Sequence, residues 1–178
     1  MPSRVLTFWF EEIEPTYWWK KDENFDQLIV DRFGGLLKQA SRCELNAWRA
    51  TPKGRLAEII VLDQFSRNVY RGTASAFSND PLALALAQEA IINQANKHLT
   101  PIENSFLYMP FMHSESLKIH QIAIDLFKGN GIESSYEFEL KHKDIIERFG
   151  RYPHRNAVLG RQSTQEEVMF LKSPGSSF

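Results

Sequence analysis

The chain has 178 residues, a length that suits one domain with a single continuous core. Hydrophobic residues make up 43% and charged residues 24%, which is ordinary for a soluble globular protein and excludes the composition of a disordered chain. The net charge of -1 gives no reason to expect nucleic acid or an acidic membrane surface as a partner.

The cysteine content and the apolar runs indicate a compartment. Cys43 is the single cysteine, so an intramolecular disulfide and a cysteine zinc site are excluded. The apolar run at 5–10 is too short and too aromatic for a signal peptide, and nowhere do about 18 apolar residues follow one another. We therefore expect a cytoplasmic protein that does not enter a membrane.

The first long helix is predicted between Asn24 and Ala40, where apolar residues recur at steps of three and four. Asn24 with Gln27 resembles a capping pair at its start. The glycine pair at 34–35 is expected to interrupt it, because glycine destabilises a helix interior.

Further helix starts follow in chain order. Thr51 and Asp80 each precede a proline. In each pair the first residue is expected to cap a helix, and the proline suits the first turn of that helix. Pro110 is expected to break an apolar helical segment, and Ser114 to begin the next helix as its N-cap. Gly129 and Gly131 are expected to end that helix.

Two capping boxes predict the last two helices, Ser134 with Glu137 and Ser163 with Glu166. Gly150 is expected to end the first of these two in a left-handed conformation.

No segment alternates like a strand, so the sequence predicts an all-α fold of roughly seven or eight helices. The helical pattern runs over 1–172 as a single domain. The remainder, 173–178, reads as a flexible tail in which Phe178 could still pack against the domain.

The first polar constellation is LDQFSRN at 62–68. Asp63 and Arg67 are four residues apart on a helix that is apolar on both sides, so they are expected to be buried and to pair. Arg67 could instead keep one face for a ligand anion, with Gln64 and Asn68 supplying neutral hydrogen bonds beside it.

The second constellation is YMPFMHSES at 108–116. Ser114 and Glu115 could simply cap a helix and complement its dipole. His113 could alternatively transfer protons, with Glu115 as its neighbour or as a second carboxylate. His-x-Glu spacing is common by chance and no strong zinc pattern completes it, so no metal site is predicted.

The third constellation is HKDIIERFGRYPHRN at 142–156. His142 falls on the core-facing side of a helix, where a histidine is more often hydrogen-bonded structure than catalyst. From 141 to 161 there are six Lys or Arg residues against two acids. This surplus predicts a bound anion or acidic partners elsewhere in the fold. Nucleic acid is not expected, because a short basic turn is not a basic face.

These stretches resemble a known family. The segments LDQFSRNVYRGTASAF, FLYMPFMHSES, HKDIIERFGRYPHRNAVLGRQSTQEEVMFL and PGSSF look like successive motifs of the bacterial and plant domain-of-unknown-function family 924 (DUF924). The resemblance implies an all-α fold similar to tetratricopeptide-repeat proteins and brings no established reaction or cofactor. Ser116 stands where the family pattern usually has an acid, which weakens any role needing a second carboxylate beside Glu115.

The leading hypothesis is a cleft that binds an anionic small molecule or an acidic peptide end, because tetratricopeptide-like folds bind peptides on a concave face. The alternative is a hydrolase or transferase in which His113 or His154 moves protons, with Glu115 as a further catalytic candidate. A third interpretation is an interaction scaffold with internally paired charges. The oligomeric state stays open. The predicted ligand-binding residues are Asp63, Gln64, Arg67, Asn68, His142, Arg148, Arg151, Arg155 and Asn156.

Overall fold

Helices follow one another along residues 1–176, the part of the chain that the computed structural model describes, and none of these residues forms a strand. The helices are α1 (Pro2–Thr7), α2 (Glu23–Ser41), α3 (Pro52–Ile60), α4 (Ser66–Val69), α5 (Asp80–Ile92), α6 (Pro101–Met112), α7 (Leu117–Asn130), α8 (Glu133–Phe149) and α9 (Gln165–Phe170). A π-helical turn, Val61–Phe65, joins α3 to α4 in one continuous run. With that run counted as one helix, residues 1–176 contain eight, so the all-α prediction is confirmed.

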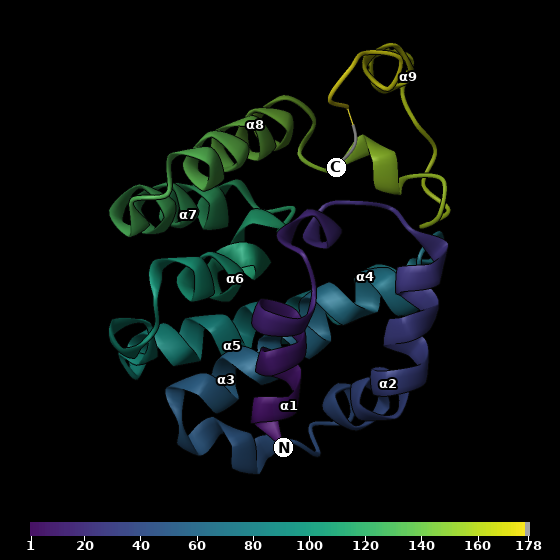
Figure 1. The fold of residues 1–178 in the computed structure, drawn as a ribbon. Coiled ribbons are helices and arrows are strands. Elements are labelled where there is room, and N and C mark those ends of the chain that lie inside the picture. Colours follow the sequence, from purple (N-terminus) through teal and green to yellow (C-terminus); the bar gives the residue numbers. More distant parts are fainter. Residues whose placement is uncertain (177–178) are drawn as a thin grey trace.

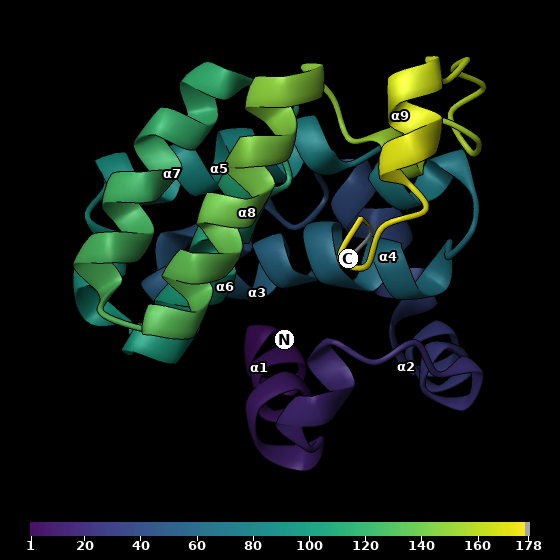
Figure 2. The same ribbon diagram turned by 90° about the horizontal axis from the view of Figure 1, so that it is seen from above.

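Successive helices from α5 to α8 stack beside one another on one side of the molecule, and α2 and α4 lie on the other (Figure 1). Seen from above, α1 and α2 occupy one edge, and α8 and α9 lie on the opposite side (Figure 2). The tetratricopeptide-like array remains a prediction.

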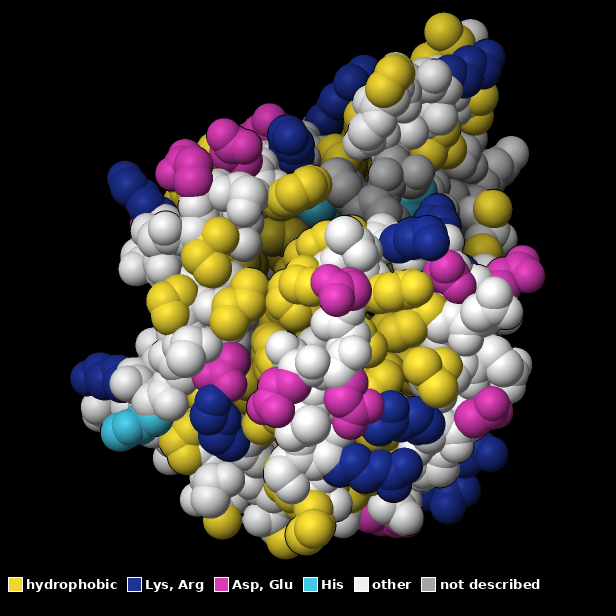
Figure 3. Space-filling model, viewed as in Figure 1, with side chains coloured by type: hydrophobic (Ala, Val, Ile, Leu, Met, Phe, Trp, Pro, Cys, Tyr) yellow, Lys and Arg dark blue, Asp and Glu magenta, His cyan; other side chains and the backbone are white. Residues whose placement is uncertain are grey.

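The core is rich in aromatic side chains contributed by the π-helical turn Phe8–Glu12 after α1, by α2 and by the α3 to α4 run. Phe8, Phe33 and Phe65 are fully buried and their ring centroids lie 4.9 to 6.1 Å apart. Rings at these distances add packing energy beyond the buried area itself. Hydrophobic side chains also gather in the middle of one face, over α1 and the turn that follows it (Figure 3). This core fixes the π-helical turn from which Asp63 projects.

The expected break at Gly34–Gly35 is wrong, because α2 runs through both glycines without interruption. Buried Phe33 and Leu37 flank the pair and hold the helix against the core, which outweighs a propensity cost of about 1 kcal/mol per glycine. The start of α2 is also corrected, since Asp22 accepts from the backbone N–H groups of two first-turn residues and is the cap.

Three other predicted caps shift. Asp80 is the first residue of α5 and its side chain caps nothing in that helix. The box at Ser134 is wrong, because α8 begins at Glu133 with no side-chain cap. The last box lies one residue later than predicted, with Thr164 and Glu167 bonding reciprocally. The predicted cap at Thr51 is confirmed by its hydrogen bond from Gly54 N.

The segment between α6 and α7 also differs from its prediction. Pro110 lies inside α6, which continues to Met112, so it does not break the helix. Ser114 does not begin α7; its Oγ accepts from Ser116 N, and α7 starts at Leu117. Residues 113–116 therefore form a turn, and His113 sits at the C-terminal end of a buried helix.

Two glycine predictions are confirmed, since Gly131 and Gly150 end α7 and α8 with φ of 78° and 68°. Gly129 does not end α7, which continues to Asn130. Near the C-terminus Ser176 is buried and donates to Leu171 O. The expected flexibility of 173–178 stays a prediction, and the proposed packing of Phe178 lies outside the described residues. No helix among residues 1–176 is long and apolar enough to span a membrane.

Candidate functional site

A cleft of about 430 Å³ lies where the start of α5, the end of α6 and the segment at 153–159 meet. Its apolar wall includes Phe77, Leu84 and Pro110. Its polar side chains are Ser78, Asp80, His113, Ser114, Glu115 and Arg155. A volume of this size is in the usual range for a small-molecule site, roughly 300 to 1,000 Å³.

Asp63 lies directly behind the cleft and is 1% exposed. It projects from the π-helical turn, a local widening that is frequent at functional positions. Its carboxylate accepts from Gln64 Nε2 at 2.6 Å and contacts Arg67 Nη1 at 3.1 Å. Burial would raise the pKa of Asp63, but Arg67 and His113 with these hydrogen bonds hold it well below its usual value. Asp63 is therefore a buried carboxylate that stays charged.

His113 connects this carboxylate to the cleft. Its Nδ1 lies 2.8 Å from Asp63 Oδ1, and its side chain is 14% exposed. A charged carboxylate can only accept, so Nδ1 carries the proton when the ring is neutral. Nε2 has no hydrogen-bond partner among residues 1–176, and the ring lines the cleft. Burial first and Arg67 second lower the pKa of His113, while Asp63 opposes them.

Asp80, which lines the cleft, forms ion pairs with two arginines. It accepts from Arg67 through both Nη atoms, at 3.0 and 3.1 Å, and from Arg155 Nη1 at 3.2 Å. Arg67 also donates to the backbone carbonyl of Asp63 at 2.7 Å. The pair expected from the four-residue spacing of Asp63 and Arg67 is therefore present, within a larger network.

Arg155 is 7% exposed, and its guanidinium lies between two aromatic rings, 4.5 Å from the centroid of Phe77 and 4.6 Å from that of Tyr152. Its Nε is buried and has no hydrogen-bond partner among residues 1–176. Burial first and Arg67 second lower the pKa of Arg155, while Asp80 opposes them. Arg155 thus shares its carboxylate partner with Arg67 and keeps one N–H group, at Nε, without an acceptor among residues 1–176.

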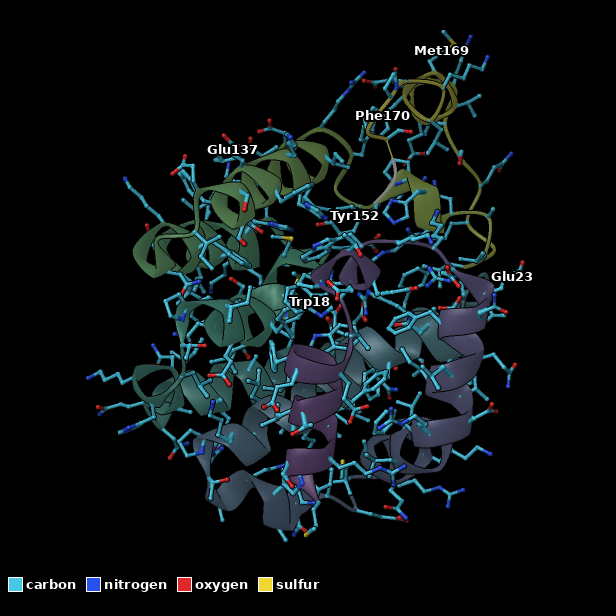
Figure 4. All side chains as sticks on the ribbon, viewed as in Figure 1. Trp18, Glu23, Glu137, Tyr152, Met169 and Phe170 are labelled. Carbon is cyan, nitrogen blue, oxygen red and sulfur yellow. The ribbon has the colours of Figure 1, made fainter. Side chains whose placement is uncertain are left out.

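Three consecutive carbonyl groups at the end of α6 each accept a side-chain hydrogen bond. Tyr152 Oη donates to Met112 O at 2.5 Å, and Arg155 Nη2 donates to His113 O at 3.0 Å. His120 Nε2 donates to Ser114 O at 2.8 Å. The last carbonyls of a helix lack partners in the helix itself, so these donors both satisfy them and fix the backbone that carries His113. Tyr152 lies where the upper helices meet the C-terminal segment (Figure 4).

A second histidine–carboxylate pair lies deeper. His120 Nδ1 is 2.7 Å from Glu139 Oε1, and both side chains are 0% exposed. Burial raises the pKa of Glu139, with His120 opposing, and Glu139 Oε2 has no hydrogen-bond partner among residues 1–176. Because Nε2 donates to a carbonyl, a single proton must lie between Nδ1 and Oε1. This pair does not reach the cleft.

Several predicted site residues lie outside the cleft. Asn68 donates to Asp26 of α2 at 2.8 Å. His142 donates from Nδ1 to Phe138 O at 2.7 Å, and burial lowers its pKa to about 3. His154 packs its ring 5.6 Å from Tyr152, and burial with the Arg155 charge lowers its pKa to about 4.

Most of the surplus arginines meet the protein's own acids. Arg148 pairs with Glu166 at 2.8 Å, and Arg151 binds Glu167 through two nitrogens at 2.7 and 2.8 Å. Both pairs connect the end of α8 to α9. The structure therefore does not bring Arg148 or Arg151 to the cleft.

Glu115 lines the cleft, and its carboxylate accepts hydrogen bonds from Arg161 and from the Tyr152 backbone. Arg161 binds it through two nitrogens, at 2.6 and 2.8 Å, and Tyr152 N donates to it at 2.7 Å. Burial would raise the pKa of Glu115, but these donors keep it below its usual value. Asn156 accepts from Arg161 at 2.9 Å, so it supports this pair rather than the cleft.

Sequence reasoning missed four residues that build the site: Asp80, His120, Tyr152 and Arg161. Asp80 was hidden by its position beside a proline, which reads as a helix start. His120, Tyr152 and Arg161 bond to Glu139, Met112 and Glu115, which are 19, 40 and 46 residues away, and local spacing does not reveal such contacts. Among residues 1–176 no three His, Cys, Asp or Glu side chains are grouped so as to hold a metal ion.

Comparison with known proteins places the chain in a family. It matches a solved structure of the Agrobacterium tumefaciens protein of unknown function ATU0120 with a TM-score of 0.91 and 38% sequence identity, over 96% of each chain. No curated protein matches. The model of a family described as "Bacterial protein of unknown function (DUF924)" matches residues 5–175. The chain therefore belongs to the DUF924 family.

Proposed function

We propose that this protein binds a small molecule carrying a carboxylate or phosphate in the cleft between α5, α6 and the 153–159 segment. Arg155 holds the anionic group. The observation that carries the proposal is the position of Arg155, which is the arginine that lines the cleft. A guanidinium recognises both anions through paired hydrogen bonds.

Arg67 and Arg155 face two carboxylates, Asp63 and Asp80, so the support for an anion comes from the burial of Arg155 and its nearness to Arg67. Asp80 accepts hydrogen bonds from both guanidinium groups, and Asp63 also contacts Arg67. The lowered pKa of Arg155 reflects burial first and the repulsion from Arg67 second. An added negative charge beside Arg155 would offset both.

The two acids that line the cleft do not oppose this binding strongly. Asp80 is bonded by two arginines, and Glu115 is bonded through both oxygens by Arg161. Their charges are therefore compensated before a ligand arrives. The apolar wall at Phe77, Leu84 and Pro110 would take the nonpolar part of the molecule.

The test is a thermal-shift measurement with matched pairs of compounds, succinate against succinamide and glycerol phosphate against glycerol. The anionic member should raise the melting temperature because it binds the folded state, and its neutral partner should not. In Arg155→Gln the apparent affinity should fall about tenfold or more, the usual effect of losing a charge-assisted contact.

Two further variants locate the binding. Ala74 lines the cleft and is exposed, so Ala74→Trp should block the cleft without disturbing the core even where Arg155→Gln folds poorly. Arg148→Gln removes an arginine outside the cleft and should bind like the wild type. A shift that survives Ala74→Trp, equal shifts from the neutral compounds, or no shift from either anion would each overturn the proposal.

A further inference from the structure

We infer that His113 is a catalytic base that takes a proton from water held in the cleft beside the bound molecule. The inference rests on the proposed function, because the bound molecule is the one that the activated water attacks. The substrate class is then an anionic ester, in which Arg155 holds the charged end and the water attacks the acyl carbon.

The orientation of the ring is the first support. Asp63 accepts the Nδ1 proton at 2.8 Å, so the lone pair of the neutral ring lies on Nε2. Nε2 has no partner among residues 1–176, and His113 lines the cleft. Because Nδ1 is turned toward buried Asp63, we place the free lone pair on the other side of the ring, toward the cleft that His113 lines.

The stability of the carboxylate behind the ring is the second support. Asp63 is 1% exposed and is bonded by Gln64 and contacted by Arg67 in addition to His113. It keeps its charge and position while His113 gains a proton, and it stabilises the imidazolium that forms. This arrangement orients a base in the way that a buried carboxylate does in other histidine sites.

The surrounding charges keep His113 ready to accept a proton. Arg67 and burial lower its pKa, whereas Asp63 and Asp80 raise it, and Arg155 bonds its backbone carbonyl. The net effect is a neutral ring at pH 7. A base must be unprotonated before it can act.

The backbone that carries His113 is fixed on both sides. The carbonyl groups of Met112, His113 and Ser114 accept from Tyr152, Arg155 and His120 respectively. Tyr152 and His120 are therefore positioning residues, since they touch the backbone and not the cleft.

The step balances without a metal or a redox partner. The O–H bond of water breaks, the proton goes to Nε2, and the water oxygen bonds to the acyl carbon with the electron pair that it keeps, while the π pair of the carbonyl group moves onto the carbonyl oxygen. That pair then re-forms the carbonyl double bond as the bond between the acyl carbon and the leaving oxygen breaks, and the leaving oxygen departs with its electron pair. Nε2 returns the proton to the leaving group or to solvent.

The experiment uses the intact chain with mono-p-nitrophenyl succinate as the anionic probe and p-nitrophenyl acetate as the neutral one. Wild type should release p-nitrophenol from the anionic ester at least tenfold faster than His113→Gln. The pH midpoint of this rate should equal the midpoint of His113 protonation read by nitrogen NMR of the ring. A base predicts this agreement, and a merely structural histidine does not.

The outcomes separate this inference from the proposed function. Equal rates in wild type and His113→Gln overturn the base, and if both still bind succinate in the thermal-shift assay the binding function stands. A rate difference that is the same for both esters supports the base and counts against the anion site. A proton found on Nε2 instead of Nδ1 in the neutral ring also overturns the base, and that measurement needs no variant to fold.

Discussion

Residues 1–176 contain two histidine–carboxylate pairs of nearly equal length, His113 with Asp63 and His120 with Glu139, whose surroundings differ. His113 and Asp63 lie 2.8 Å apart at the edge of a cleft, and His120 and Glu139 lie 2.7 Å apart with no exposed surface. Asp63 has Arg67 and Gln64 as further partners, so its pKa is lowered, whereas burial dominates at Glu139 and raises its pKa.

We propose that the first pair, His113 with Asp63, exchanges protons with a ligand, whereas the second, His120 with Glu139, supports the fold. In the pair at the cleft, His113 with Asp63 (the open pair), Nε2 of the ring has no hydrogen-bond partner among the described residues. In the fully buried pair, His120 with Glu139 (the sealed pair), Glu139 bonds one ring nitrogen and Ser114 O bonds the other. Both histidines have a carboxylate at one ring nitrogen, so the carboxylate does not distinguish their roles. The groups around the other ring nitrogen do.

The largest change in stability is expected when the sealed pair is broken. His120→Ala should lower the free energy of unfolding by about 3 kcal/mol or more, because it leaves Glu139 buried and removes the donor to Ser114 O. His113→Ala should cost only about 1 kcal/mol, since Asp63 keeps Arg67 and Gln64. Urea unfolding of both variants measures the difference, and equal losses would erase the distinction.

An intermediate change is expected in how the free energy of unfolding depends on pH, and it comes from His142. The pKa of His142 is lowered to about 3, so the folded state favours the neutral ring and its contribution is present above pH 6.5 and lost as pH falls toward 3. Between pH 7 and pH 5 this one group should remove about 2 kcal/mol of stability. Urea unfolding of wild type and His142→Gln at both pH values should show a loss smaller by that amount in the variant. An equal loss would contradict the lowered pKa.

The smallest effect tests the arginines that lie away from both pairs. Arg148 and Glu166 form an ion pair in which both side chains are more than half exposed. Arg148→Gln should change the free energy of unfolding by no more than about 0.5 kcal/mol, because solvent screens exposed pairs. A loss above 1 kcal/mol in the same urea assay would show that the link between α8 and α9 matters more than its exposure indicates.

Several features that depend on one helix alone were predicted correctly from the sequence. The Asp63 and Arg67 pair and the left-handed ends at Gly131 and Gly150 follow from local spacing. The contact of Asp63 with His113 spans 50 residues, and no local pattern contains it. Asp80 illustrates the same limit, because the helix start was visible and its arginine partners were not.

Local ambiguity explains other errors. The stretch STQEE at 163–167 fits a capping box in two registers, and the structure uses Thr164 with Glu167. Glu167 also binds Arg151, so a tertiary contact accompanies the register that forms. The continuous helix through Gly34 and Gly35 has the same kind of cause, since buried neighbours outweigh the weak propensity of the pair.

The most direct test of the central claim, that His113 faces an open site and His120 does not, is labelling with diethyl pyrocarbonate followed by mass spectrometry of the intact folded protein. The reagent acylates an unprotonated imidazole nitrogen that it can reach. The account predicts that His113 reacts at least a hundredfold faster than His120, and that Ala74→Trp slows labelling of His113 alone. Equal protection of both histidines in the wild type would contradict it.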